Sequence, residues 1–255
     1  MKAGQLRDYL FEKYPRENAC SWDNVGLLCG DPEQEIERLL VALDVTDDVI
    51  DEAIAMGADG ILAHHPLLRG GLMALTPEKD GRAYRLCRAG IAAVCMHTNL
   101  DISEGGVGDC LADALRLNAP RPVFADEENA ELLFGRVGRV REQTPEGFCE
   151  FVKDALKTPF VRAVLGTKPV RTVAVMGGSG KDYIEQAASV ADAYVTADCR
   201  YHDFQLAERL GLTLIDAGHY PTENVVIPAL CEAVREAFED VEIRVSEHAD
   251  LIRLI

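Results

Sequence analysis

Histidine is scarce in this chain, and five of its six histidines lie just past apolar runs that are typical of strands. Two of them are followed by a carboxylate at the same spacing, because Asp101 comes four residues after His97 and Glu223 four residues after His219. Imidazole nitrogen and carboxylate oxygen are ligands that suit Zn, Fe, Mn and Co. The pattern predicts a metal centre, and its candidate ligands are His64, His65, Asp101, His219 and Glu223.

The adjacent histidines His64 and His65 favour two ions over one. Neighbouring side chains of an extended chain point to opposite sides, so the pair is placed to serve two ions rather than to chelate one. Asp101 and Glu223 supply negative charge that two cations need. For any single histidine, an ordinary hydrogen-bonded role at a strand end is the better explanation. Two strand-end clusters with the same His-x-x-x-carboxylate spacing favour two divalent metal ions per chain.

His97 and His202 are the candidate catalytic residues. His97 is placed to orient a metal ligand, as the hydrogen-bonding partners of ligating groups commonly do. His202 follows Tyr201 at the start of an expected helix. Two interpretations of His202 stay open: it lines the substrate pocket and moves protons, or it only caps the helix.

A glycine-rich segment, Gly-Gly-Ser-Gly-Lys at residues 177–181, is expected to follow a strand and open a helix. It is not a P-loop, because Val175 stands where the first glycine should be and Asp182 replaces the required Ser or Thr. A tight turn is the plain interpretation. Its backbone N–H groups would still be able to cradle an anionic substrate near the metals.

Short apolar strands that alternate with helices position these side chains. Strands are expected at residues 39–43, 61–63 and 91–95, and Thr46 is expected to cap a helix that ends at Gly57. This alternation predicts a mostly parallel sheet. Functional residues gather at the carboxyl ends of the strands in such sheets, which is where the histidine clusters fall.

The second half of the chain repeats the first. The matching segments are residues 41–43 with 173–175, 50–53 with 184–187, 58–59 with 191–192, 90–91 with 211–212, and His97-x-x-x-Asp101 with His219-x-x-x-Glu223. Each match is weak alone, but five in the same order indicate a duplication. The sequence predicts an internally duplicated α/β fold, in which two similar α/β halves carry a metal site at their interface.

The expected division places a first α/β half at residues 1–120, a connecting segment with some structure at 121–170, and a second half at 171–255. The three parts are expected to form one compact unit, because a chain of 255 residues with 48% hydrophobic residues can bury a sizeable core.

The charge balance limits the partners. Asp and Glu total 43 against 26 Lys and Arg, which gives a net charge of −17. The sequence has no Lys and Arg cluster of the kind that binds nucleic acid. An acidic chain repels anions, so a phosphate-bearing substrate would need bound metal to offset the field.

The eight cysteines form no Cys-x-x-Cys pair, so a thiolate zinc finger is not expected, and most are predicted to be reduced and buried. The first residues lack an apolar signal core, and no run approaches the ~18 apolar residues of a membrane span. The sequence therefore predicts a cytoplasmic protein without a membrane partner.

Several motifs together resemble the Nif-three-like family, whose members are often labelled GTP cyclohydrolase type 2 homologues and which includes the bacterial YbgI-like proteins. The resemblance runs from about residue 4 to residue 250. The motifs that carry it are Ser21-Trp22-Asp23-Asn24-Val25-Gly26-Leu27, Ala63-His64-His65-Pro66-Leu67, His97-Thr98-Asn99-Leu100-Asp101, Tyr201-His202-Asp203 and Asp216-Ala217-Gly218-His219-Tyr220-Pro221-Thr222-Glu223.

The resemblance implies a duplicated α/β fold, a two-metal site, and a toroidal homohexamer with the metals facing an internal cavity. Arg200 stands where the family often has Lys, and Tyr220 stands where it often has Phe. The middle segment is too short for the inserted domain of some relatives. The family's metal ligands carry over to His64, His65, Asp101, His219 and Glu223.

The leading functional hypothesis is a metal-dependent hydrolase, similar to GTP cyclohydrolase type 2, that acts on a nucleotide or a cyclic amide. Two ions can activate a water for such a reaction, and His202 or His97 would handle protons. The alternative is a non-catalytic metal-binding protein with a regulatory or metal-handling role. A scaffold braced by metals is a third reading, but structural sites are usually closed and hold one ion.

Overall fold

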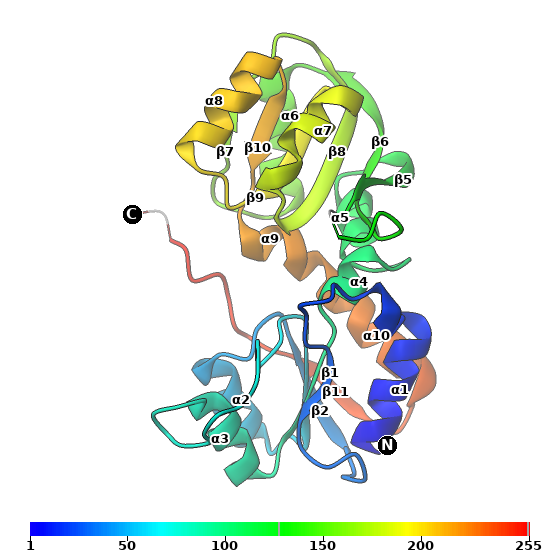
Figure 1. Ribbon diagram of the computed structural model, residues 1–255, viewed down its shortest axis with the longest axis vertical. Helices are drawn as coiled ribbons and strands as arrows, with labels where there is room; N and C mark the ends of the chain where they lie inside the picture. The colour runs from blue at the N-terminus through cyan, green and yellow to red at the C-terminus, as the bar shows by residue number, and fades with distance from the viewer. Residues whose placement is uncertain (127, 254) are drawn as a thin grey trace. The chain divides into compact units, whose positions relative to one another are not determined.

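A computed structural model describes residues 1–126, 128–253 and 255 (Figure 1). The chain forms two compact units, and each combines segments that are distant in the sequence. The first unit consists of Met1–Ser103 and Ile227–Ala249, and the second consists of Glu104–Val226 and Asp250–Ile255.

The first unit is built on a sheet with the strand order β1-β4-β3-β2-β11. Strands β2, β3 and β4 are parallel to one another, β11 is parallel to β2, and β1 is antiparallel to β4. Helices α2 and α3 cover one face, and α1 and α10 cover the other (Figure 1). The elements are α1 (Ala3–Lys13), η1 (Arg16–Asn18), β1 (Gly26–Cys29), β2 (Arg38–Ala42), α2 (Asp47–Met56), β3 (Gly60–Ala63), α3 (Gly81–Ala89), β4 (Ala92–Cys95), α4 (Thr98–Ile102), α10 (Ile227–Ala237) and β11 (Glu242–Val245).

The second unit is built on a sheet with the strand order β5-β6-β8-β9-β10-β7. Here β8, β9 and β10 are parallel, while β6 runs antiparallel to β8 and β7 antiparallel to β10. Helices α5 and α6 pack on one face through an apolar core that includes Leu111, Phe148 and Val173. The elements are α5 (Val107–Ala114), β5 (Asn118–Ala125), β6 (Leu133–Gln143), α6 (Pro145–Ala155), β7 (Arg162–Val164), β8 (Val170–Ser179), η2 (Lys181–Tyr183), α7 (Ile184–Val190), β9 (Ala193–Ala197), α8 (Tyr201–Leu210), β10 (Thr213–Asp216), α9 (His219–Glu223) and η3 (Asn224–Val226).

The two units share one connectivity. In the first, β2-α2-β3-α3-β4 forms three parallel strands with antiparallel β1 on the outer edge of β4. In the second, β8-α7-β9-α8-β10 forms the same arrangement, with antiparallel β7 on the outer edge of β10. This confirms the α/β class, and the matching connectivity agrees with the predicted duplication.

Helix α2 forms where the sequence predicts it, because local interactions define both of its ends. The Thr46 side chain accepts a hydrogen bond from the Val49 N–H at 3.3 Å, and Asp47 and Asp48 lie in the first turn. Both features stabilise the positive end of the helix. The helix ends at Gly57, whose φ of 65° is a left-handed conformation that glycine adopts at low cost.

The boundaries differ from the expected division at residues 120 and 170. Residues 227–249 belong to the first unit, because β11 extends its sheet and pairs with β2, with Ile243 opposite Leu39. The segment 121–170 does not act as a connector, since β5, β6, α6 and β7 are part of the second unit.

The glycine-rich segment also differs from its prediction. Strand β8 continues to Ser179, so Gly177 and Gly178 lie in the strand instead of a turn, and the helical segment η2 begins only at Lys181. The Gly178 N–H donates to Thr222 Oγ1 at 3.0 Å, and the Gly180 N–H donates to Thr196 Oγ1 at 2.9 Å. These two amides bind the protein itself, which makes them poor donors to an anionic substrate.

In the part of the chain that the structure describes, the cysteines are free thiols, and most are buried, as predicted. None of the described helices combines the length and apolar character needed to cross a membrane.

Candidate metal centre

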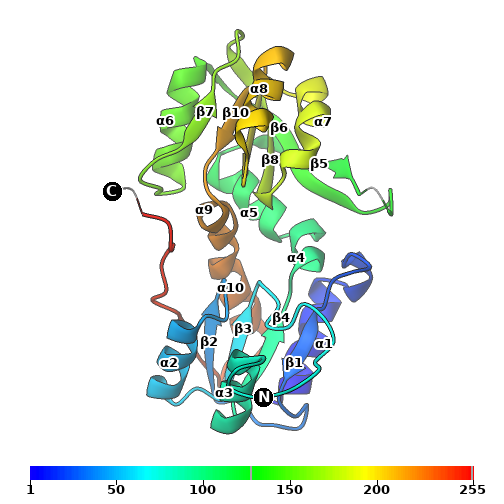
Figure 2. The same ribbon diagram turned by 60° about the vertical axis from the view of Figure 1, so that its left-hand side comes forward.

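Strands β2, β3 and β4 lie side by side in the first sheet (Figure 2). Their carboxyl ends bring three histidines together. His64 and His65 follow β3, and His97 follows β4. One ring nitrogen from each of the three can be chosen so that all lie within 4.8 Å of one another. That spacing allows the three imidazoles to bind the same metal centre.

His64 and His65 do not point to opposite sides. The chain leaves the extended conformation after Ala63, and the two rings lie 4.9 Å apart at an interplanar angle of 42°. The two side chains therefore do not follow strand alternation, which applies only to extended backbone. The prediction of two ions stays a prediction.

The orientation of each ring is fixed by an oxygen at Nδ1. His64 Nδ1 is 2.9 Å from the carbonyl oxygen of Met96, and His65 Nδ1 is 2.7 Å from Asp44 Oδ1. A carbonyl or carboxylate oxygen accepts the Nδ1 proton, which leaves the Nε2 lone pair available to a metal ion. His64 is fully buried, so its ring has little freedom to rotate away.

His97 has the same arrangement. Both carboxylate oxygens of Asp23 lie close to His97 Nδ1, at 2.9 and 3.0 Å, and the Thr98 N–H and hydroxyl also donate to Asp23. Burial opposes ionisation of Asp23, but the hydrogen bonds from His97 and Thr98 outweigh it and hold its pKa well below the usual range. Asp23 therefore stays a carboxylate that holds the His97 ring in place.

Trp22 lies next to His97 although it is 64% exposed. The two ring centroids are 6.0 Å apart in an edge-to-face arrangement. The loop around it is held by hydrogen bonds from Cys20 N–H to Thr98 Oγ1 and from Asn24 Nδ2 to the Leu68 carbonyl. Trp22 thus combines an accessible aromatic ring with a loop that is held by hydrogen bonds.

Asp101 reaches the same group from helix α4. Its Oδ1 is 3.5 Å from His64 Nε2, the nitrogen that faces away from Met96. This places a carboxylate oxygen beside an imidazole nitrogen, a pair of donors that suits a divalent transition metal.

The second unit carries its own pair of donors at the carboxyl end of β10. His219 Nε2 lies 3.0 Å from Glu223 Oε2, one helical turn away on α9, and His219 Nδ1 lies 2.8 Å from Asp198 Oδ2. Burial lowers the affinity of His219 for a proton, but the two carboxylates outweigh it and raise its pKa to about 9. In the metal-free protein the imidazole therefore carries a proton between two carboxylates, where a cation is favoured.

Strand β8 has glycine at positions 177 and 178, where the Glu223 side chain packs against its backbone. A Cβ on Gly178 would fall against Glu223 Oε1, well inside van der Waals contact, and one on Gly177 would lie 3.2 Å from Glu223 Cγ. Gly178 also has a φ of 59°. The close approach of the Glu223 carboxylate therefore favours glycine at both positions, a role that was not predicted from the sequence.

His202 lies on helix α8, exposed to solvent. Its Nδ1 is 2.9 Å from Gln205 Oε1, and its ring contacts Tyr201. The Asp203 carboxylate, rather than His202, accepts the Arg200 N–H at the start of the helix, at 2.6 Å. The capping interpretation of His202 is therefore not supported.

The family described as Duf34/NIF3 (NGG1p interacting factor 3) matches residues 1–250. The chain belongs to this family. A GTP cyclohydrolase 1 type 2 homolog of Streptomyces coelicolor is 40% identical over 221 residues, which cover 82% of this chain and 77% of that protein. A protein of the same name from Clostridium perfringens is 34% identical over 258 residues, covering 98% and 97%. The crystal structure of a Bacillus cereus protein related to NIF3 has a TM-score of 0.88 at 26% identity, covering 100% of this chain and 99% of that one.

In this member of the Duf34/NIF3 family, three carboxylates that support the histidines were not predicted from the sequence. Asp44, Asp198 and Asp23 each bind a histidine Nδ1. Asp44 and Asp198 come one or two residues after the buried strands β2 and β9, a position that could have identified them. Asp23 lies 74 residues from its histidine and had no comparable signal.

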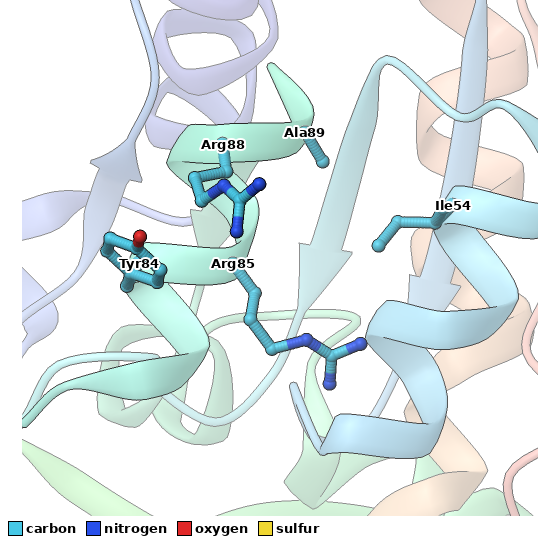
Figure 3. A pocket seen from close by; sticks show the side chains of 5 residues that line it. All are labelled: Ile54, Tyr84, Arg85, Arg88 and Ala89. Carbon is cyan, nitrogen blue, oxygen red and sulfur yellow. The ribbon is translucent and has the colours of Figure 1, made fainter. Parts of the chain in front are cut away.

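Of the cavities that the described residues form, two lie in different units. One, of about 290 Å³, is lined by His219, Asp198, Arg162 and Phe160 in the second unit. The other, of about 260 Å³, lies between α2 and α3 of the first unit, where Arg85 and Arg88 of α3 and Ile54 of α2 line it (Figure 3). The cavity beside His219 contains a candidate metal ligand, and it is therefore the better candidate for a substrate.

Proposed function

We propose that this chain is a dinuclear metal-dependent hydrolase that acts on a nucleotide or a cyclic amide. The observation that carries the proposal is the shared orientation of four imidazoles, each held at Nδ1 by a carbonyl or carboxylate oxygen. Ligating histidines almost always have such a partner. The proposed ligands are His64, His65, Asp101, His219 and Glu223.

The donor set fits Zn, Fe, Mn or Co. It offers imidazole nitrogens and carboxylate oxygens and no thiolate, and two carboxylates offset part of the charge of two divalent ions. His97 has the same Nδ1 support as His64 and His65 and lies within the same group. We therefore include His97 as a further candidate ligand, besides the proton-handling role predicted for it.

Bound at these donors, two divalent ions would polarise the substrate and lower the pKa of a water molecule. The chain's own residues orient the reactants. Asp23, Asp44 and Asp198 hold the imidazoles, and the cavity beside His219 offers Phe160 as an apolar surface and Arg162 as a hydrogen-bond donor. At about 290 Å³, that cavity accommodates a base or a cyclic amide rather than a whole nucleoside triphosphate.

His202 is proposed to move protons during turnover. It is exposed and its Nδ1 is bound to Gln205, which favours Nε2 as the nitrogen that exchanges protons. In this proposal His202 acts on the substrate and does not hold the ions.

Elemental analysis and an activity screen test the proposal together. Chelated protein is reloaded with each metal, and turnover is measured on nucleotides and on cyclic amides. His64→Ala and Glu223→Ala should lose at least one ion and all hydrolysis, because each removes a coordinate bond. His202→Ala should keep both ions and lose turnover. The matched control is His248→Ala, which should change neither.

The outcomes separate the alternatives. Full metal content without turnover on any compound would favour the non-catalytic, metal-handling function. A ceiling of one ion per chain would contradict the dinuclear centre. Unchanged turnover in His202→Ala would assign proton transfer to His97 or to water.

Trp22 is the chain's single tryptophan and lies beside His97, so its fluorescence reports on this part of the centre. Metal loading should change the emission in the parent protein. In His97→Ala the change should shrink if His97 is a ligand and persist if it is not.

Two further properties are proposed with this function. The chain is proposed to act in the cytoplasm, where its free thiols stay reduced. It is also proposed to form the toroidal homohexamer that its family resemblance implies.

A further inference from the structure

Two cysteines that are 58 residues apart in the sequence touch each other in the first unit. Cys29 Sγ, in edge strand β1, lies 3.4 Å from Cys87 Sγ, on helix α3. Neither residue belongs to the candidate metal centre. The contact joins the outermost strand of the sheet to the helix that packs beside it.

The two thiols differ in their access to solvent. Cys87 is exposed, whereas Cys29 is 8% exposed and packs in the apolar core between the sheet and helices α2 and α3. Burial, followed by the contact with Cys87, raises the pKa of the Cys29 thiol to about 12. An oxidant in solution therefore meets Cys87 first, and Cys29 is the thiol held next to it.

We propose that Cys29 and Cys87 form a reversible, oxidisable dithiol site that closes to a disulfide when the protein meets hydrogen peroxide. In the first step the Cys87 sulfur attacks the peroxide, the O–O bond breaks, and a sulfenic acid and one water form. In the second step the Cys29 sulfur displaces the sulfenic hydroxyl as a second water, and the S–S bond forms. The two thiols lose two electrons and two protons, and one peroxide becomes two waters.

The geometry allows closure with a small movement. A disulfide needs its sulfurs ~2.0 Å apart, so they must approach by about 1.4 Å. Helix α3 is short, and it ends at Gly90, whose φ of 68° marks a separate turn before β4. In this proposal a small shift of the helix end closes the gap between the sulfurs, and the sheet register is kept.

Closure would restrain the first unit without touching a proposed metal ligand. The bond would link residues 29 and 87, a long loop whose closure reduces the entropy of the unfolded chain. The oxidised protein should therefore unfold at a higher temperature than the reduced protein. Its metal content should be the same, since β1 contributes none of the proposed ligands.

Mass spectrometry of metal-loaded protein treated with a small excess of hydrogen peroxide tests the site. The expected result is a loss of ~2 Da, the mass of two hydrogens, a cross-linked peptide that contains Cys29 and Cys87, and full reversal by dithiothreitol. Cys87→Ser should abolish both the cross-link and the rise in unfolding temperature. The matched control is Cys110→Ser, which alters another partly exposed thiol and should leave both intact.

Two results would overturn the inference. One is gain of oxygen by Cys87, as sulfinic or sulfonic acid, without a cross-link. The other is a cross-link between Cys29 and the neighbouring Cys95 in place of Cys87. Cys29→Ser should also abolish the cross-link. If that variant does not fold, Cys87→Ser is sufficient to test the inference, because Cys87 is exposed and tolerates the substitution. None of these measurements depends on hydrolysis, so they test the dithiol site independently of the proposed function.

Discussion

At the scale of single residues, the support behind the histidines is the feature that distinguishes a prepared centre from histidines at strand ends. Asp23 shows this most clearly. Its carboxylate side chain is 1% exposed and accepts hydrogen bonds from His97 and from the N–H and hydroxyl of Thr98. Buried groups with several charge-assisted hydrogen bonds contribute both orientation and stability.

Replacing Asp23 by Asn should weaken both the orientation of the His97 ring and the stability of the protein. Asn keeps one carbonyl acceptor but loses the charge, so the His97 ring is held less firmly. Metal affinity should fall ~10–100-fold if His97 is a ligand, as is typical for such supporting groups. The free energy of unfolding should fall by about 1–3 kcal/mol. Isothermal titration with Zn²⁺ and urea unfolding measure the two effects.

Asp31→Asn is the control, because Asp31 accepts the Glu33 N–H in an exposed loop. It should behave like the parent protein. Unchanged metal affinity in Asp23→Asn would show that His97 takes no part in binding.

Gly178 offers a second test at this scale. A methyl group there would displace the Glu223 carboxylate, and the φ of 59° adds strain. Gly178→Ala should therefore lose metal as well as stability. Gly211→Ala isolates the strain, since Gly211 has a φ of 69° but open space around its Cβ position. It should lose about 1 kcal/mol and keep its metal. Equal metal content in the two variants would contradict the proposed role of Glu223.

At the scale of elements, helix α5 is fixed to strand β6 by a buried ion pair. Arg136 Nε binds Asp109 Oδ1, with the arginine side chain 4% and the aspartate side chain 25% exposed. The same aspartate accepts the Gly105 N–H at 2.8 Å, and Arg136 Nη1 donates to the Gly135 carbonyl at 2.9 Å. The pair therefore sets how the helix begins and where it packs.

Asp109→Ala should destabilise the protein by about 3–5 kcal/mol, because it removes the carboxylate from a buried guanidinium. Chemical unfolding followed by circular dichroism measures the loss. The matched control is Glu142→Ala, which breaks the exposed pair with Arg171 and should leave the unfolding midpoint close to that of the parent. Similar midpoints in both variants would mean that the buried pair adds no stability.

At the scale of the whole molecule, the net charge of −17 and the acidic residues around the histidines favour cations. The family resemblance adds an expectation about assembly. Light scattering should give a mass several times the 27.9 kDa of one chain, since closed symmetric oligomers are the norm for such proteins. A mass of 27.9 kDa at micromolar concentration would contradict the proposed hexamer.

The sequence by itself determined the α/β class, the strand ends that carry the histidines, and the duplication. These depend on local signals. The buried run from Gly60 to Ala63 predicts a strand on its own, and Thr46 and Gly57 bound a helix through contacts within a few residues. The repeated His-x-x-x-carboxylate spacing is equally local, because one helical turn brings His219 to Glu223.

Only the tertiary structure decided which groups support those histidines and where the chain ends pack. Asp23 binds His97 across 74 residues, β11 joins β2 from the far end of the chain, and Cys29 meets Cys87 on a different element. The bend that brings His64 beside His65, and the glycine that makes room for Glu223, have the same origin. Each depends on atoms that become neighbours only when distant segments pack, so no short stretch of sequence contains the information.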